Sequence, residues 1–364
     1  MGDLASAFAV DYAQARKHFG AAAAARTLAV ESHVHPAERG AQDEPLAMDV
    51  ACWGNATARA LLVVTSGVHG VEGFGGSGCQ VALLRDDAVC AAVARADVAV
   101  LFVHAVNPFG FSHLRRTNED NVDVNRNFRD FDRASPPNAL YGELHPTLVP
   151  DVWPPTAANS AALGALAQLH GPLALQSAIT AGQAEHADGL FYSGLAPAWS
   201  NGVLRGVLER HCAGRAHVAW VDLHTGLGPW GHGERIHAGP DDPAAMARAK
   251  AWYGADVTTV HDGSSTSTAE AGTCQHAARD ACGPARFTGI TLEFGTRPAT
   301  DVLQALRGDQ WRWNHPDADA AVRRTAARTL RDAFFDDDPA WQAMLVAQSR
   351  LTVVQALVAL RREP

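Results

Sequence analysis

The chain lacks Cys-x-x-Cys spacing and has no apolar run of about 18 residues, the shortest that would span a membrane. Its six cysteines are scattered over 364 residues, so we expect reduced thiols rather than a disulfide framework or a cysteine zinc site. The N-terminal segment has neither the basic start nor the uninterrupted apolar core of a signal peptide. These absences predict a cytoplasmic protein without a membrane span.

Positive charge is also scarce. Lys and Arg total 30 against 39 Asp and Glu, which gives a formal net charge of −9. Nucleic acids and anionic membranes bind basic surfaces, so neither is expected as a partner. Hydrophobic residues make up 47% of the chain and charged residues 19%, an ordinary globular balance. A small-molecule or peptide substrate fits this composition better, and no oligomeric state is predicted.

Apolar, β-branched runs alternate along the chain with segments of helical spacing. The expected strands are 46–53, 60–66, 97–106, 216–223 and 287–294, and the expected helices are 6–30, 77–85, 157–183, 197–212 and 241–253. This alternation predicts a mainly parallel sheet with helices on both faces, whose ligands lie beyond the carboxyl ends of the strands. The proline-rich segment 129–153 is predicted to be a long loop that covers or shapes the site.

A glycine-rich turn after strand 60–66 holds His69 and Glu72 three residues apart. Imidazole nitrogen and carboxylate oxygen suit zinc, and a catalytic zinc takes three protein ligands and one open position. His224, at the end of strand 216–223, is the candidate third ligand, with a core histidine as the alternative. The turn also contains Gly-x-Gly-x-x-Gly at 73–78, but a dinucleotide-binding turn starts with glycine at the strand's end. Nucleotide binding is therefore only a minor alternative.

Two further polar features follow predicted strands. Residues 114–128 contain three arginines and four asparagines, and guanidinium and amide groups together can recognise a carboxylate. A solvated polar loop is the alternative interpretation. Glu293 lies near the end of a β-branched strand, where burial would raise its pKa and suit it to general base catalysis. Its alternative is a structural ion pair with Arg286 or Arg297.

Together, four stretches resemble the zinc metallocarboxypeptidase superfamily, which includes carboxypeptidase A and the succinylglutamate desuccinylase and aspartoacylase branch. They are His69-x-x-Glu72, Arg116 with 122–128, 222–226 and 291–295. The resemblance spans about 45–300 and is strongest to a bacterial group of largely unassigned substrate. It implies one metallopeptidase-like catalytic domain over 1–364, with a twisted, mainly parallel mixed sheet flanked by helices and a helical extension from 300 to 364.

The resemblance also implies a metal centre and a catalytic base. His69, Glu72 and His224 would hold one zinc ion per chain, which lowers the pKa of water. Glu293 would take the proton of that water and return it to the leaving amine. Spacing alone does not choose zinc over other metals that accept nitrogen and oxygen ligands.

The arginine-rich stretch would bind the substrate. Arg116, or Arg115 if the register is shifted by one, would polarise the scissile carbonyl, and Asn125 with Arg126 would grip a carboxylate. One departure is that carboxypeptidase A has a tyrosine on a mobile loop shortly before its base, whereas 258–291 contains none.

The expected activity is hydrolysis of an amide or peptide bond next to a free carboxylate, with a small peptide or acylated amino acid as substrate. The alternatives are an N-acyl amino acid deacylase and a non-catalytic carboxylate- or peptide-binding protein.

Overall fold

The computed structural model describes residues 4–55, 57–239, 241–283 and 286–363. Its strands are β1 (Val30–Arg39), β2 (Pro45–Trp53), β3 (Ala60–Ser66), β4 (Val98–His104), β5 (His217–Gly226), β6 (Gly233–His237), β7 (Thr258–Thr259) and β8 (Arg286–Gly295). They form one sheet in the order β1-β2-β4-β3-β5-β8-β6-β7. The central strands β4, β3, β5 and β8 are parallel, whereas β1, β2 and β6 pair antiparallel with neighbours. The predicted mixed α/β sheet is confirmed.

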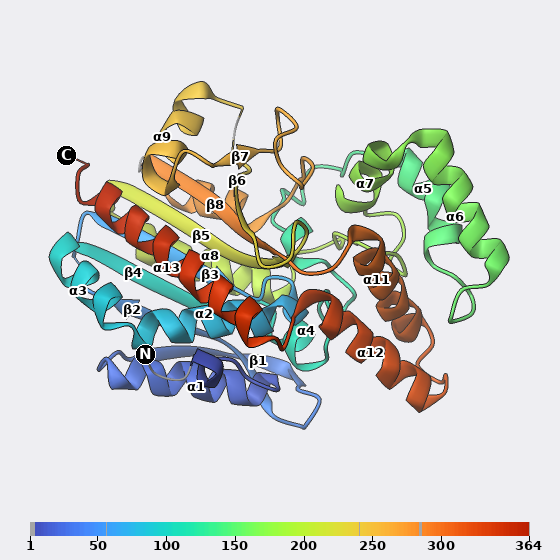
Figure 1. Cartoon of the computed structure of the whole chain (residues 1–364), viewed down its shortest axis with the longest axis horizontal. Helices are drawn as coiled ribbons and strands as arrows, with labels where there is room; N and C mark the ends of the chain where they lie inside the picture. Colours follow the sequence, from blue (N-terminus) through green and yellow to red (C-terminus); the bar gives the residue numbers. More distant parts are fainter. Residues whose placement is uncertain (1–3, 56, 240, 284–285, 364) are drawn as a thin grey trace.

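Helices surround this sheet (Figure 1). The α-helices are α1 (Tyr12–Ala25), α2 (Gly73–Arg85), α3 (Asp87–Ala96), α4 (Pro108–Ser112), α5 (Ala139–Leu148), α6 (Ala157–His170), α7 (Pro172–Thr180), α8 (Trp199–Cys212), α9 (Pro243–Tyr253), α10 (Cys274–Ala281), α11 (Ala299–Asn314), α12 (Ala320–Phe334) and α13 (Pro339–Leu360). Short 3-10 turns are η1 (Leu4–Ala7), η2 (Gly70–Glu72) and η3 (Val124–Arg126).

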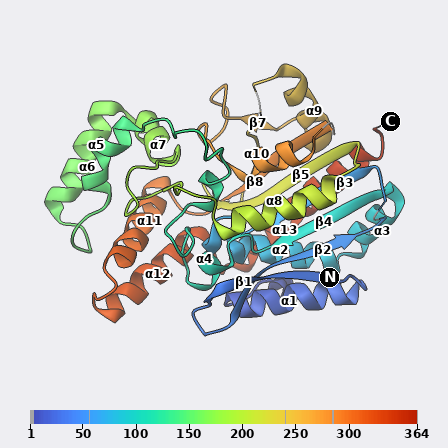
Figure 2. The same ribbon diagram turned by 180° about the vertical axis from the view of Figure 1, so that it is seen from behind.

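Two hydrophobic cores lie on opposite faces of the sheet. Strand β3 shows why, because its side chains alternate between the faces: Leu62 and Val64 belong to one core, and Leu61 and Val63 to the other. Helices α1, α2, α3 and α13 cover the first face, and α8 and α10 cover the second, as Figures 1 and 2 show from the two sides. Both faces are buried, as the apolar strand sequences predict.

The glycine-rich segment 73–78 lies inside helix α2 rather than in a phosphate-binding turn. A Cβ on Gly76 would come within 2.7 Å of the Cβ of Ser66 in β3, and one on Gly75 within 2.8 Å of Thr225 in β5. The glycines thus let α2 approach the sheet closely. This packing accounts for them without a nucleotide.

Helix α13 is, by length and composition, the one helix in the described part of the chain that could cross a membrane. It packs here against α2, α3 and α9, and its Trp341, Leu345 and Val353 are buried.

Two predictions of local structure were wrong, and further strands were not predicted. The proline-rich segment 129–153 contains α5, which begins after Asn138, whose side chain accepts a hydrogen bond from the Tyr141 N–H at 3.1 Å. The helix expected over 157–183 is broken at Gly171, which has a φ of +84°. Strands β1 and β6 were not expected. In β1 the reason is an exposed, polar pattern, which is typical of a sheet edge.

Candidate metal centre and active site

The predicted ligands and the predicted base come together at the carboxyl ends of three adjacent parallel strands. Strand β3 leads into the turn that carries His69 and Glu72, and β5 beside it carries His224. Strand β8 pairs with β5 so that Glu293 lies directly opposite His224. Contrary to expectation His224 is not at the strand's end, because β5 continues to Gly226.

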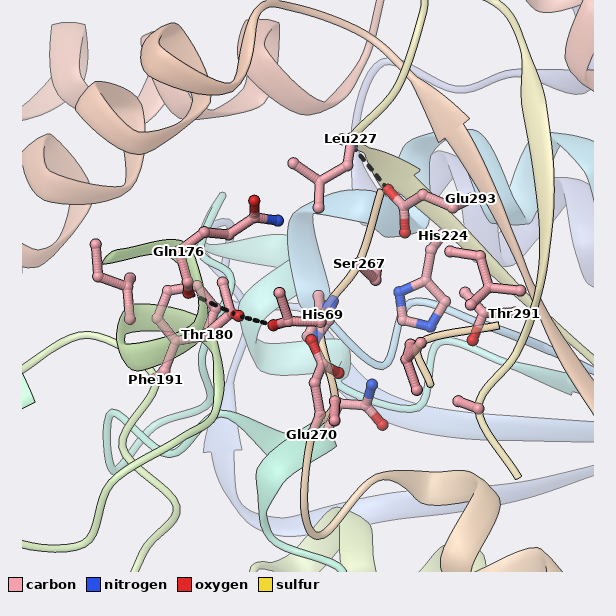
Figure 3. Close-up of a pocket in the computed structure, with 18 of the residues that line it drawn as sticks. His69, Gln176, Thr180, Phe191, His224, Leu227, Ser267, Glu270, Thr291 and Glu293 are labelled. Carbon is pink, nitrogen blue, oxygen red and sulfur yellow. Dashed lines mark hydrogen bonds between the residues drawn. The ribbon is translucent and has the colours of Figure 1, made fainter. Parts of the chain in front are cut away.

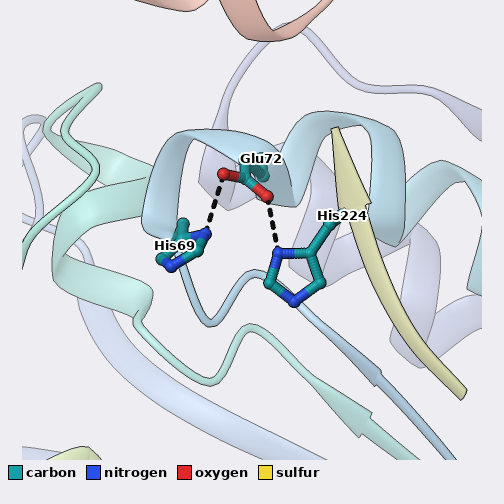
Figure 4. Close-up of side chains that lie close together, drawn as sticks. All are labelled: His69, Glu72 and His224. Carbon is teal, nitrogen blue, oxygen red and sulfur yellow. Dashed lines mark hydrogen bonds and ion pairs between the residues drawn. The ribbon is translucent and has the colours of Figure 1, made fainter. Parts of the chain in front are cut away.

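His69, Glu72 and His224 form a compact, buried group (Figure 4). Nδ1 of His69 lies 2.8 Å from one carboxylate oxygen of Glu72, and Nδ1 of His224 lies 3.1 Å from the other. The potential ligand atoms all lie within 4.8 Å of one another. Two imidazole nitrogens and a carboxylate are a set that zinc accepts at catalytic sites. The side chains therefore fit a metal ion, with Nδ1 as the ligand atom of each histidine.

The opposite nitrogen of each imidazole faces an aspartate. His224 Nε2 lies 2.7 Å from Asp222 Oδ2, and His69 Nε2 lies 3.4 Å from Asp123 Oδ1. At His224, a carboxylate at this position favours a proton on Nε2 and leaves Nδ1 free to ligate, as in many metal sites. At His69, Nε2 lies between the Asp123 carboxylate and the guanidinium of Arg116, which is a donor only. Asp222 and His224 are two residues apart in β5, so their side chains lie on the same face of the strand. The role of Asp123 was missed, because nothing in the polar stretch 114–128 singles it out.

Electrostatics at the cluster suit a cation. Burial acts to raise the pKa of Glu72, but His69 and His224 outweigh it and hold that pKa below its ordinary value. Burial acts to lower the pKa of His224, but Asp222 and Glu72 outweigh it, so this pKa lies well above the ordinary value. A metal ion would therefore take the place of a proton held between these groups.

Glu293 is a buried carboxyl beside this cluster. Burial is the largest cause that raises its pKa, to about 8, and the nearby Glu72 carboxylate adds to it. One oxygen accepts the Leu227 N–H at 3.0 Å, as the dashed line in Figure 3 marks. The alternative of an ion pair with Arg286 or Arg297 is not what the structure shows, since these arginines pair with Glu363 and Asp336.

Of the two candidate arginines, the structure brings Arg116 to the cluster. Its guanidinium is 3.3 Å from Glu72 and 2.6 Å from His69 Nε2, and its Nε donates to Asp123 at 2.9 Å. Arg115 points elsewhere, with its guanidinium 4.0 Å from the ring centroid of Trp313 and an ion pair to Asp309. Arg116 thus places a buried positive charge next to the candidate metal ligands.

Asn125 and Arg126 line the same cavity, but Arg126 is already bonded. It donates to the carbonyls of Thr180 at 2.7 Å and Asn125 at 3.0 Å, and pairs with the Glu270 carboxylate at 2.6 Å. The Asn125 side-chain oxygen accepts the Cys274 N–H at 2.8 Å. Glu270 lies in a Ser/Thr-rich loop 144 positions beyond Arg126, where no local pattern marks it as its partner.

The cavity has a volume of about 850 Å³, a size typical of small-molecule sites. Polar residues of the cluster form one part of its wall. An apolar part is contributed by helices α6, α7, α11 and α12, through Leu163, Leu175, Ile179, Leu303, Leu306 and Phe334. The site can therefore hold a ligand with both a polar and an apolar portion.

Tyr253 does not take the place of the loop tyrosine of carboxypeptidase A. Its hydroxyl is buried, with the carbonyl oxygens of Thr288 at 2.7 Å and Trp220 at 3.0 Å both within reach of its single hydrogen. The loop that precedes β8 offers Ser267 and Thr268 to the cavity instead.

The chain is similar to several solved structures. A metallocarboxypeptidase from Burkholderia cenocepacia is 13% identical, with 95% of this chain and 68% of that one covered and a TM-score of 0.48. Carboxypeptidase A from Helicoverpa armigera is 14% identical, with 87% and 73% covered and a TM-score of 0.43. A protein assigned to the succinylglutamate desuccinylase/aspartoacylase family from Shewanella amazonensis is 17% identical, with 75% and 69% covered and a TM-score of 0.36.

No curated protein matches the chain. At such low identities the activity has to be argued from the site itself. One family model, described as protein of unknown function (DUF2817), matches residues 8–348, and the chain belongs to this family.

Proposed function

We propose that the protein is a zinc-dependent hydrolase that cleaves an amide or peptide bond next to a free carboxylate, with a small peptide or acylated amino acid as substrate. The observation that carries the proposal is the buried His69–Glu72–His224 group with Glu293 opposite His224 at the wall of a large cavity. Ligands for a metal and a carboxyl poised for proton transfer are the parts that such a hydrolysis needs.

Zinc held by His69, Glu72 and His224 would act as a Lewis acid and make water a stronger acid. Glu293 would accept the proton from water and donate it to the leaving amine. Its pKa of about 8 lies near neutral pH in the protein without metal, and proton transfer is most efficient when the catalytic pKa is near the working pH. The Leu227 N–H donates to one carboxyl oxygen, and the other oxygen would exchange the proton.

Arg116 would stabilise the negative charge that develops on the carbonyl oxygen. Its guanidinium is buried, and Asp123 fixes its orientation through Nε. Fixed donors aimed at developing charge are effective where water is excluded, and removal of one typically slows the reaction about 100- to 1,000-fold.

An N-acyl amino acid deacylase is the second candidate. The same metal ligands and base serve it, and two observations favour it over an ordinary carboxypeptidase. The loop before β8 lacks the tyrosine, and Arg126 is already paired with a carboxylate of the protein.

The test is turnover of zinc-loaded protein on two matched panels, C-terminal dipeptides with a blocked N-terminus and N-acyl amino acids. Glu293→Gln should lower kcat by at least about 100-fold with zinc still bound. The matched control is Asp280→Asn, an exposed carboxylate on α10, which should keep full activity.

Retained turnover in Glu293→Gln would remove Glu293 from the base role. No turnover of either panel by the zinc-loaded wild type would favour the carboxylate-binding alternative.

A further inference from the structure

The ion pair between Arg126 and Glu270 lies inside the cavity, where a substrate's charged group is expected. The Arg126 side chain is 1% exposed and that of Glu270 is 24% exposed. Both residues line the cavity that the metal ligands share, and Figure 3 draws Glu270 in it. A positive and a negative group are thus presented together to whatever binds there.

The loop that carries Glu270 is tied to the rest of the cavity wall. Gln176 of α7 donates to the Thr266 carbonyl at 2.8 Å, and the hydroxyls of Thr180 and Thr268 are 2.9 Å apart. Gly272, with a φ of +70°, lets the loop pass against the backbone of Arg126, where a Cβ would collide. Glu270 is therefore positioned by its loop as well as by its ion pair.

The pair changes which charges the cavity accepts. A guanidinium has five N–H donors, and Arg126 uses three of them within the protein, which leaves two. A ligand that carries only a carboxylate can bind these two donors, but the like charge of Glu270 repels it. A ligand that carries only an ammonium can bind Glu270, but the charge of Arg126 repels it. A group with a carboxylate and an ammonium side by side satisfies both residues.

We propose that Arg126 and Glu270 together bind a zwitterionic head group, so that the amine half of the substrate amide carries both a carboxylate and an ammonium. The simplest such compounds are amides formed on the side-chain amine of a diamino acid whose α-amino and α-carboxyl groups are free. The inference rests on the proposed function, because it names the substrate class of the same site. Asn125 lies next to Arg126 in the cavity wall and adds an amide to the carboxylate side.

The test uses three probes that share one acetamide and a chain of similar length. Nε-acetyl-lysine, offered as both enantiomers, has both charges; 6-acetamidohexanoate has only the carboxylate; and N-acetylcadaverine has only the ammonium. Binding is measured by calorimetry on zinc-loaded Glu293→Gln, which prevents turnover. One enantiomer of Nε-acetyl-lysine should bind at least about tenfold more tightly than either singly charged probe, a factor worth about 1.4 kcal/mol.

Glu270→Gln, combined with Glu293→Gln, should weaken the binding of Nε-acetyl-lysine at least about tenfold. It should leave the affinity for 6-acetamidohexanoate unchanged or increase it. Glutamine can still accept a hydrogen bond from Arg126, so the loop keeps its contact. Asp280→Asn, which removes one exposed negative charge, should change none of the affinities.

Equal binding of the three probes, no binding of Nε-acetyl-lysine, or an equal loss for every probe in Glu270→Gln would overturn the proposal. The same measurements distinguish a failure of this proposal from a failure of the proposed hydrolase function. If the preference is present but wild-type protein cleaves no amide, the zwitterion site stands and the hydrolase does not. If wild-type protein cleaves the probes without preference, the hydrolase stands and the zwitterion site does not.

Discussion

Glu293 should make the metal-free protein less stable as pH rises, and Glu293→Gln should remove the part of the pH dependence of stability that this residue causes. Its folded-state pKa of about 8 exceeds the ordinary 4.5 because the carboxyl is buried and Glu72 is near. Between these values the folded protein binds more protons than the unfolded chain, so the free energy of unfolding falls with pH. The values differ by about 3.5 pH units, and at about 1.4 kcal/mol per unit the loss from this residue has an upper bound of about 5 kcal/mol.

The assay is urea unfolding of chelator-treated wild type and Glu293→Gln from pH 4.5 to pH 9. Glutamine keeps the acceptor for Leu227 N–H, so the comparison isolates the charge. The stability gain of the variant should be smallest near pH 4.5, grow up to about pH 8 and then level off. Zinc should shrink this gain, because a bound cation favours the carboxylate. Stability curves that run parallel over this range would refute the reasoning.

Two other sets of substitutions test the geometry. Asp222→Asn and Asp123→Asn should each weaken zinc binding about 10- to 100-fold by releasing the imidazoles that they orient, measured by competition with a chelator; unchanged affinity in both would contradict the assignment. Gly76→Ala should lower the free energy of unfolding, because the new Cβ would lie 2.7 Å from that of Ser66. Gly20→Ala, whose Cβ would have no atom within 4 Å, should raise the free energy of unfolding by up to about 1 kcal/mol. Both are measured by urea unfolding. The same sign for both glycines would contradict the packing described for α2.

The central strands and the grouping of the candidate metal ligands could be predicted from local patterns. Strand β3 is a β-branched run that ends in a turn with His69 and Glu72, and β5 and β8 are apolar runs interrupted near their ends by His224 and Glu293. A polar residue in an otherwise buried strand stands out in a sequence, and parallel strands bring their carboxyl ends together.

Features that depend on distant partners could not be predicted in the same way. The pairing of Arg126 with Glu270 and the contact of Asp123 with His69 join segments far apart in the chain. Helix α5 was hidden by the prolines around it, although Asn138 is a good helix cap. The edge strand β1 has no apolar alternation because most of its side chains are exposed. Tertiary contacts rather than local preference set these features.

The metal content of the purified protein tests the central claim most directly. Wild type, His69→Ala and His145→Ala are loaded with zinc, desalted and analysed by elemental mass spectrometry. His145 belongs to a second group in the described part of the chain that could hold a metal ion, with His186 and Asp188, so its variant shows whether that group holds the zinc instead. We predict about one zinc per chain in wild type and His145→Ala and none in His69→Ala. Folded wild type without zinc, or His69→Ala with as much zinc as wild type, would contradict the metal centre on which the proposed function depends.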